Sequence, residues 1–205
     1  MRKLAKPLVF IAALVPLAWL VFIVLTGRTS ANPAEDIHLT TGIWALRFLL
    51  ITLAITPVRR VTRWNILIQY RRMLGLFAFF YATLHLTGYL VFDQLVMEEG
   101  ALRRVIADIA KRPFITFGMT AFVLMVPLAL TSTKGWIRRL GRRWQMLHRL
   151  IYLSGIAACL HFVWKVKVAI GEPVYYAAIL ALLLGFRLLW RLRHTRGVRR
   201  QPAQA

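Results

Sequence analysis

Three histidines lie inside apolar stretches of the chain, and their spacing is the first indication of chemistry. His148 and His161 belong to the segment GRRWQMLHRLIYLSGIAACLHFVWK over residues 141–165, and His85 belongs to RRMLGLFAFFYATLHLTGYLVF over residues 71–92. Ionisable groups inside lipid are costly and usually functional, and neutral imidazole is a common axial ligand of haem iron. The histidines are therefore candidate haem ligands. A hydrogen bond to a neighbouring helix is the competing role for each.

The composition indicates an integral membrane protein. Of 205 residues, 59% are hydrophobic and the mean hydropathy is +0.61, whereas soluble domains are about 45–50% apolar. The net charge of +21 does not indicate a nucleic-acid partner, because the basic residues form short clusters between apolar runs. Cys159 is the single cysteine, which excludes an intrachain disulfide and a cysteine-ligated iron–sulfur or zinc site.

Six apolar segments are long enough to span a membrane as helices, so we expect one all-α six-helix domain over residues 1–205. A cleavable signal peptide is the alternative for the first segment, but its apolar run is longer than such peptides use. Prolines 16 and 127 should kink their helices, and prolines 113 and 173 should begin theirs. The expected spans are 8–26, 41–57, 73–92, 114–131, 147–165 and 174–190, followed by a basic tail over 191–205.

Charge predicts the orientation. Most of the 28 Lys and Arg residues lie at the N-terminus, between spans two and three, between spans four and five, and in the tail, whereas all 7 Asp and Glu residues lie on the other side. The positive-inside rule therefore places both termini in the cytoplasm. Membrane lipid is an expected partner, because clustered arginines also attract anionic headgroups.

Depth pairs two of the histidines. With the third and fifth spans both entering from the cytoplasm, His85 and His161 lie about 18 and about 21 Å from that surface at 1.5 Å per helical residue. Two imidazoles at one depth on two helices could ligate a haem iron from both sides. Haem ligation by His85 and His161 is thus the leading hypothesis for the site.

His148 lies near the cytoplasmic boundary, at the level of Arg71 and Arg72. These residues could hold a second haem with one histidine ligand, or a flavin or quinone whose anionic or electron-rich groups face the arginines. An ideal helix places His148 and His161 about 140° apart around its axis. A shared interior therefore requires a bend, for which Gly155 is a candidate.

Several residues outside these candidate sites also have more than one possible role. Arg47 lies inside the second span and could bind a haem propionate or extend its side chain to the surface. His38 is expected at a helix start, with a spare outer ligand as the alternative, and His194 belongs to the basic tail. Residues 94–112 have apolar side chains at helical spacing, which predicts an amphipathic surface helix that packs on the bundle or docks a partner.

The runs YATLHLTGYL, LTSTKGWIRRLGRRWQMLHRLIYL and ACLHFVWKVK resemble the MsrQ (YedZ) family, within the ferric reductase and NADPH oxidase transmembrane superfamily. The resemblance covers nearly the whole chain. It implies six helices in a bacterial inner membrane, haem b in one or two copies, FMN, and electron delivery to a periplasmic molybdopterin methionine sulfoxide reductase of the MsrP type. No motif here identifies FMN-binding residues.

The chain departs from the wider superfamily in its third span, where Arg71 and Arg72 replace the cytoplasmic-side histidine. No nucleotide-binding fingerprint is present, so the quinone pool or a cytosolic flavin reductase is the expected donor. No hydrolytic or nucleophilic constellation is evident, and we expect an electron-transfer subunit rather than the catalytic one. A stand-alone ferric or oxygen reductase and a proton-coupled transporter remain alternatives.

Overall fold

The computed structural model describes residues 2–95, 101–166 and 171–198, which are helical and contain no strand. Six helical stretches are long and apolar enough to cross a membrane, which confirms the predicted six-span, all-α class. These stretches are Ala5–Leu25, Pro33–Thr62, Asn65–Phe92, Pro113–Leu130, Arg142–Lys165 and Glu172–Arg193.

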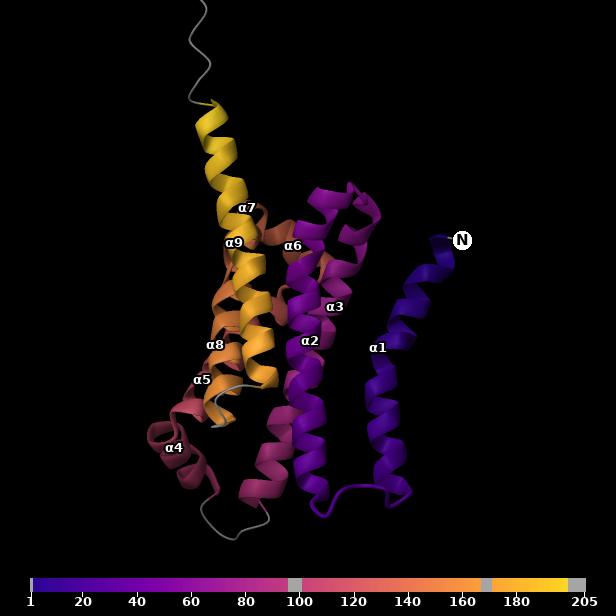
Figure 1. Ribbon diagram of the computed structural model, residues 1–205, viewed down its shortest axis with the longest axis vertical. Helices are drawn as coiled ribbons and strands as arrows, with labels where there is room; N and C mark the ends of the chain where they lie inside the picture. Colours follow the sequence, from indigo (N-terminus) through magenta and orange to yellow (C-terminus); the bar gives the residue numbers. More distant parts are fainter. Residues whose placement is uncertain (1, 96–100, 167–170, 199–205) are drawn as a thin grey trace, which may run out of the picture.

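The described residues form nine α-helices together with a short 3-10 helix, η1, and a π-helical turn, η2 (Figure 1). In chain order they are α1 (Arg2–Leu25), α2 (Pro33–Thr62), η1 (Asn65–Tyr70), α3 (Arg71–Gly88), η2 (Tyr89–Leu95), α4 (Ala101–Lys111), α5 (Pro113–Leu130), α6 (Lys134–Leu140), α7 (Arg142–Leu147), α8 (Leu150–Lys165) and α9 (Glu172–Val198). Of the α-helices, α4 and α6 lie outside the six spans.

Local sequence explains several helix starts. Asn32 caps α2, its side chain accepting a hydrogen bond from the Glu35 backbone N–H at 3.4 Å, and Pro33 occupies the first turn, where a missing N–H costs nothing. Pro113 begins α5 in the same way, and Pro173 lies in the first turn of α9, as predicted.

Two antiparallel helix pairs form the centre of the bundle. α2 packs along α3, and α5 packs along α8, while α9 lies against α8 and α2. α1 stands at the side of α2 and α3 (Figure 1). The core includes Leu49, Leu53 and Tyr81, which are almost completely buried, whereas Leu8 and Trp19 of α1 are largely exposed. Apolar exposure on that scale suits a surface that faces lipid.

α1 bends beside α3 (Figure 1). Pro16 lies inside α1, as predicted for a kink. The Tyr81 hydroxyl of α3 enters the opened turn, accepting a hydrogen bond from the Leu17 N–H at 3.1 Å and donating one to the Ala13 carbonyl at 2.9 Å. These are the two groups that an undistorted helix would bond to each other, so an inserted side chain sustains the bend.

The fifth span is not one continuous helix. α7 ends at Leu147, α8 begins at Leu150, and His148 and Arg149 form the turn between them. The predicted bend at Gly155 is wrong, because Gly155 is buried within continuous α8. A Cβ there would lie 3.4 Å from Leu180 and Leu53, so this glycine serves close helix packing.

The predicted amphipathic segment is helical over Ala101–Lys111, where α4 packs on α5, and residues 96–100 lie outside the described part of the chain. Asp108 connects α4 to its neighbours, because it accepts a hydrogen bond from the Tyr89 hydroxyl at 2.9 Å and pairs with Arg112 at 3.2 Å. The far side of α4 is open, with Ile106 60% exposed.

Candidate functional site

His85 of α3 and His161 of α8 lie together, as their equal depth predicted. The centroids of the two imidazole rings are 6.0 Å apart and the ring planes are inclined at 78°. The pair joins the two central helix pairs, because α3 belongs to one and α8 to the other. This meeting point is the first candidate site.

A backbone carbonyl sets the orientation of each ring. His85 Nδ1 is 3.1 Å from the His38 carbonyl oxygen, and His161 Nδ1 is 2.6 Å from that of Phe114. A carbonyl can only accept, so each Nδ1 carries the proton and each Nε2 keeps its lone pair. No hydrogen bond to either Nε2 is found among the described residues, which leaves both nitrogens available as ligands.

A glycine faces each ring from the partner helix. A Cβ built on Gly42 of α2 would lie 3.0 Å from His85 Nδ1 and Cε1, and one built on Gly118 of α5 would lie 2.8 Å from His161 Nδ1. Both distances are shorter than ordinary van der Waals contact. Any residue larger than glycine at position 42 or 118 would therefore overlap an imidazole ring.

The two halves of the site are built alike. The hydrogen-bonded histidine and carbonyl are 47 residues apart in both halves, and adding 76 to the residue numbers of one half gives the other. The corresponding residues are His38, Gly42 and His85 in the first half and Phe114, Gly118 and His161 in the second. α2 and α5 run in one direction and α3 and α8 in the other (Figure 1). The two halves thus share their residue spacing and the directions of their helices.

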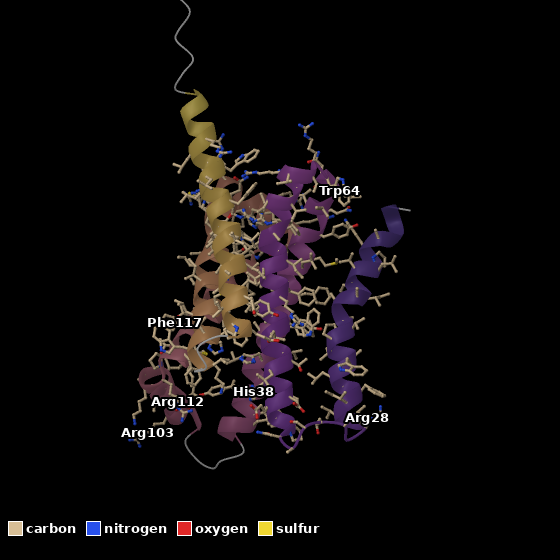
Figure 2. The ribbon with its side chains drawn as sticks, viewed as in Figure 1. Arg28, His38, Trp64, Arg103, Arg112 and Phe117 are labelled. Atoms are coloured by element: carbon tan, nitrogen blue, oxygen red, sulfur yellow. The ribbon has the colours of Figure 1, made fainter. Side chains whose placement is uncertain are left out.

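His38 is closer to this pair than the sequence suggested. It lies near one end of the molecule (Figure 2), and its ring is 5.6 Å from that of His85, edge to face. Its carbonyl orients His85, and its ring packs near Gly88, where a Cβ would be 3.5 Å from His38 Cε1. His38 therefore supports His85 through both backbone and ring.

Arg47 is half-buried on α2 and is held by aromatic side chains. Its Nε donates to the Tyr176 hydroxyl at 2.8 Å, and its guanidinium lies 4.9 Å from the centre of the Trp44 ring. Both contacts hold the side chain within the bundle, on the helix that carries Gly42. The structure thus places a positive charge beside α2, within the bundle.

A second site is a cavity of about 790 Å³ at the other end of the bundle. It lies between the cytoplasmic-side ends predicted for α2, α3, α8 and α9. Six arginines line it, with no acidic residue among its described lining: Arg60, Arg71, Arg72, Arg149, Arg187 and Arg191. The deeper wall is apolar, with Leu76, Phe79, Met125 and Ile151. Such a cavity suits a ligand with an apolar or planar body and an anionic or electron-rich head.

His148 belongs to this cavity together with Arg71 and Arg72, as the sequence analysis proposed. Its ring stacks on Trp144 at 3.8 Å between centroids, and its Nδ1 is 3.1 Å from the Trp144 carbonyl oxygen. Its Nε2 is buried without a hydrogen-bond partner among the described residues. His148 is therefore oriented like the outer histidines, with one nitrogen bonded and the other available.

Arg187 is a site residue that was not predicted from the sequence, although it lies inside the predicted sixth span. It is half-buried, and it donates to the Tyr152 hydroxyl at 3.0 Å and to the Leu53 carbonyl at 2.5 Å. Its Nε and the Thr56 hydroxyl both line the cavity and lack hydrogen-bond partners among the described residues. An arginine inside a predicted span was the available signal.

The donor set limits the chemistry. Among the described residues no three or more His, Cys, Asp or Glu side chains gather where they could hold a metal ion. The His85–His161 pair offers two nitrogens only, so an iron held there needs its other ligands from a bound macrocycle. That requirement is the one a porphyrin meets.

Comparison with known proteins agrees with this architecture. Residues 41–159 match the family model described as ferric reductase like transmembrane component. No solved structure matches the chain.

Curated relatives carry the name protein-methionine-sulfoxide reductase heme-binding subunit MsrQ. One from Xanthomonas oryzae pv. oryzae (strain MAFF 311018) is 50% identical, covering 98% of this chain and 94% of the relative. One from Xanthomonas campestris pv. campestris (strain 8004) is 51% identical over 97% and 92%, and one from Herminiimonas arsenicoxydans is 50% identical over 91% and 85%. The chain is a multi-pass membrane protein that belongs to the MsrQ family, within the ferric reductase-like transmembrane family.

Proposed function

We propose that the chain is a haem b electron-transfer subunit, which passes electrons from a cytoplasmic-side donor to a periplasmic methionine sulfoxide reductase. The observation that carries the proposal is the meeting of His85 and His161 between the two central helix pairs. The relatives' name, which describes a heme-binding subunit of a methionine sulfoxide reductase, supports both the cofactor and the catalytic partner.

The residues present fit a haem at this pair. The ring centroids are 6.0 Å apart, so His85 and His161 would be close enough to hold one metal ion between them through metal–nitrogen bonds of about 2 Å. Both Nδ1 atoms are bonded to carbonyls, which leaves each Nε2 as the ligand atom. A haem held by His85 and His161 would supply single-electron transfer at this position.

The protein residues have separate tasks in this arrangement. The His38 and Phe114 carbonyls hold the Nδ1 protons of the two neutral imidazoles, so that Nε2 is the free nitrogen of each ring. Arg47 is the residue we propose for an anionic propionate, because its charge lies within the bundle. The surrounding apolar helices exclude water, which limits side reactions at the redox centre.

We assign the electron donor to the cytoplasmic-side cavity. Quinol from the membrane, or the flavin of a cytosolic reductase, has a planar body for the apolar wall and polar groups for the arginines. FMN is the flavin implied by the family resemblance, and a second haem with His148 as one ligand is the competing occupant. Pyridine-haemochrome quantification distinguishes the second haem from the other occupants, because it gives the number of haems per chain.

Replacement of the paired histidines tests the proposal. We expect His85→Ala and His161→Ala, produced with haem supplied, to lose the low-spin spectrum of the dithionite-reduced minus oxidised protein. Each variant removes one axial ligand, so the iron becomes five-coordinate or is not retained. His194→Ala, in the basic tail of the sequence, is the control and should keep the wild-type spectrum.

Two results would contradict this assignment. A colourless wild-type preparation, made with haem supplied, would end the cytochrome proposal. A full low-spin signal in both variants would show that the iron has other ligands.

A further inference from the structure

We propose that Gly42 and Gly118 are positioning residues that set the planes of the two ligating imidazoles, and so the electronic state of the iron. The inference rests on the proposed function, because the measurements of haem content, EPR signal and potential require a bound haem. Its structural basis lies in the helix pairs themselves: each glycine faces a histidine ring from the neighbouring helix.

The first step is steric. A Cβ on Gly118 would come within 2.8 Å of His161 Nδ1, 3.1 Å of Cε1 and 3.3 Å of Cγ. On Gly42 it would come within 3.0 Å of both Nδ1 and Cε1 of His85. Even alanine therefore has to displace a ring, and the displacement is greater at Gly118.

The second step excludes a backbone requirement. Gly42 and Gly118 lie inside α2 and α5, and neither is among the described glycines with positive φ, which are Gly27 and Gly141. In a helix interior glycine is about 1 kcal/mol less favourable than alanine. The local helix gains nothing from these glycines, so their use is in the space they leave for the rings.

The third step is the carbonyl one turn away. Each partner helix presents an accepting carbonyl, at His38 or Phe114, and four residues later a glycine. The hydrogen bond holds one ring nitrogen, while the glycine lets the ring lie close against the helix. A side chain at the glycine would rotate the ring about this hydrogen bond and change the 78° angle between the planes.

Alanine substitutions with a helical control test the proposal. Gly185→Ala in α9 is the control, because a Cβ there meets nothing within 4 Å. The readouts are haem per chain, the g-values of the ferric low-spin EPR signal, which depend on the angle between the imidazole planes, and the midpoint potential. We expect shifted g-values and potential in Gly42→Ala, a larger change with loss of more than half of the haem in Gly118→Ala, and wild-type values in Gly185→Ala.

A double-mutant cycle on the haem-free protein separates positioning from general packing. Gly118→Ala should lower the thermal midpoint in the wild-type background and leave it unchanged or raised beside His161→Ala, because the ring it strikes is gone. An equal loss in both backgrounds would overturn the proposal, as would unchanged EPR signals in both glycine variants. If Gly118→Ala does not fold, Gly42→Ala decides by the same measurements with His85→Ala. Retention of the low-spin signal in His85→Ala and His161→Ala would instead refute the haem assignment and leave the cycle interpretable.

Discussion

An imidazole that ligates a metal through one nitrogen carries a proton on the other nitrogen, and that N–H group needs a hydrogen-bond acceptor. In this protein the acceptor for that proton is always a backbone carbonyl, at His38 for His85, Phe114 for His161 and Trp144 for His148. A carbonyl carries no full charge and cannot take the proton away, in contrast to a carboxylate. The three histidines are therefore oriented without a buried acid, which a membrane interior would penalise.

Arg47 offers a test at the scale of one residue. We expect Arg47→Ala to weaken haem retention by about tenfold or more, or to shift the midpoint potential, because hydrogen bonds to charged groups contribute about 1.5–3 kcal/mol. The measurements are haem content after extended washing and a redox titration.

The matched control is Tyr176→Phe, which removes the hydrogen-bond partner of Arg47 and keeps the charge, so its effect should be smaller. Unchanged haem content and potential in Arg47→Ala would favour the alternative in which this arginine extends toward the membrane surface.

At the scale of elements, helix ends and irregular turns place the functional groups. The turn at His148 and Arg149 lets His148 face the cavity while α8 carries His161 to the outer pair. Likewise, the Tyr81 hydroxyl replaces a missing bond in α1, which ties that helix to α3, the helix of His85. Irregular backbone inside a membrane is tolerated where other groups satisfy it.

Removing the Tyr81 hydroxyl should loosen α1. We expect Tyr81→Phe to reduce the free energy of unfolding in detergent by about 1–3 kcal/mol, since a buried donor and acceptor lose their partner. Denaturant titration of the purified protein measures the change. Tyr175→Phe is the control because Tyr175 is 68% exposed, and equal stability of the two variants would show that α1 closes its own turn.

Depth along the spans predicted the His85–His161 pair, and the apolar runs predicted six helices, because both depend only on helical rise and hydrophobicity. The glycine and carbonyl partners were beyond that reasoning, since they depend on which helix faces each ring. The sequence nevertheless contained a signal, because Gly42 and His85 are separated by the same number of residues as Gly118 and His161. The turn at His148 could not be predicted, because no proline or glycine marks it.

At the scale of the whole molecule, the two sites lie at different levels of one bundle. Trp64 and Arg28 mark its opposite ends (Figure 2), and the arginine-lined cavity lies at the same end as Trp64, where α2 finishes and α3 begins. The positive-inside rule predicts that this end faces the cytoplasm. The proposed function then has electrons enter at the cytoplasmic end and leave at the opposite end.

Cysteine labelling tests this orientation. In a Cys159→Ser background, we expect Trp64→Cys to react with a membrane-impermeant maleimide in inside-out vesicles, and Arg28→Cys to react in right-side-out vesicles. Both positions are exposed, whereas Cys159 is buried. The reverse labelling pattern would place the cavity outside and contradict the proposed direction of transfer.

The last prediction concerns the direction of electron flow. His148 and His161 are thirteen residues apart, or about 20 Å along an ideal helix, so loss of the inner histidine need not disturb the outer pair. We expect His148→Ala to keep a low-spin haem that dithionite reduces normally and to slow its reduction by quinol or by a flavin reductase with FMN by tenfold or more.

The arginines of the cavity supply an electrostatic counterpart to that experiment. Arg71 and Arg72 line the cavity beside His148, and a positive surface attracts an anionic flavin phosphate less strongly as salt rises. The paired change Arg71→Ala and Arg72→Ala should therefore give a milder defect that no longer responds to salt, measured by stopped-flow reduction at low and high ionic strength. Loss of all haem in His148→Ala, or a normal rate with the physiological donor, would show that electrons do not enter through this cavity.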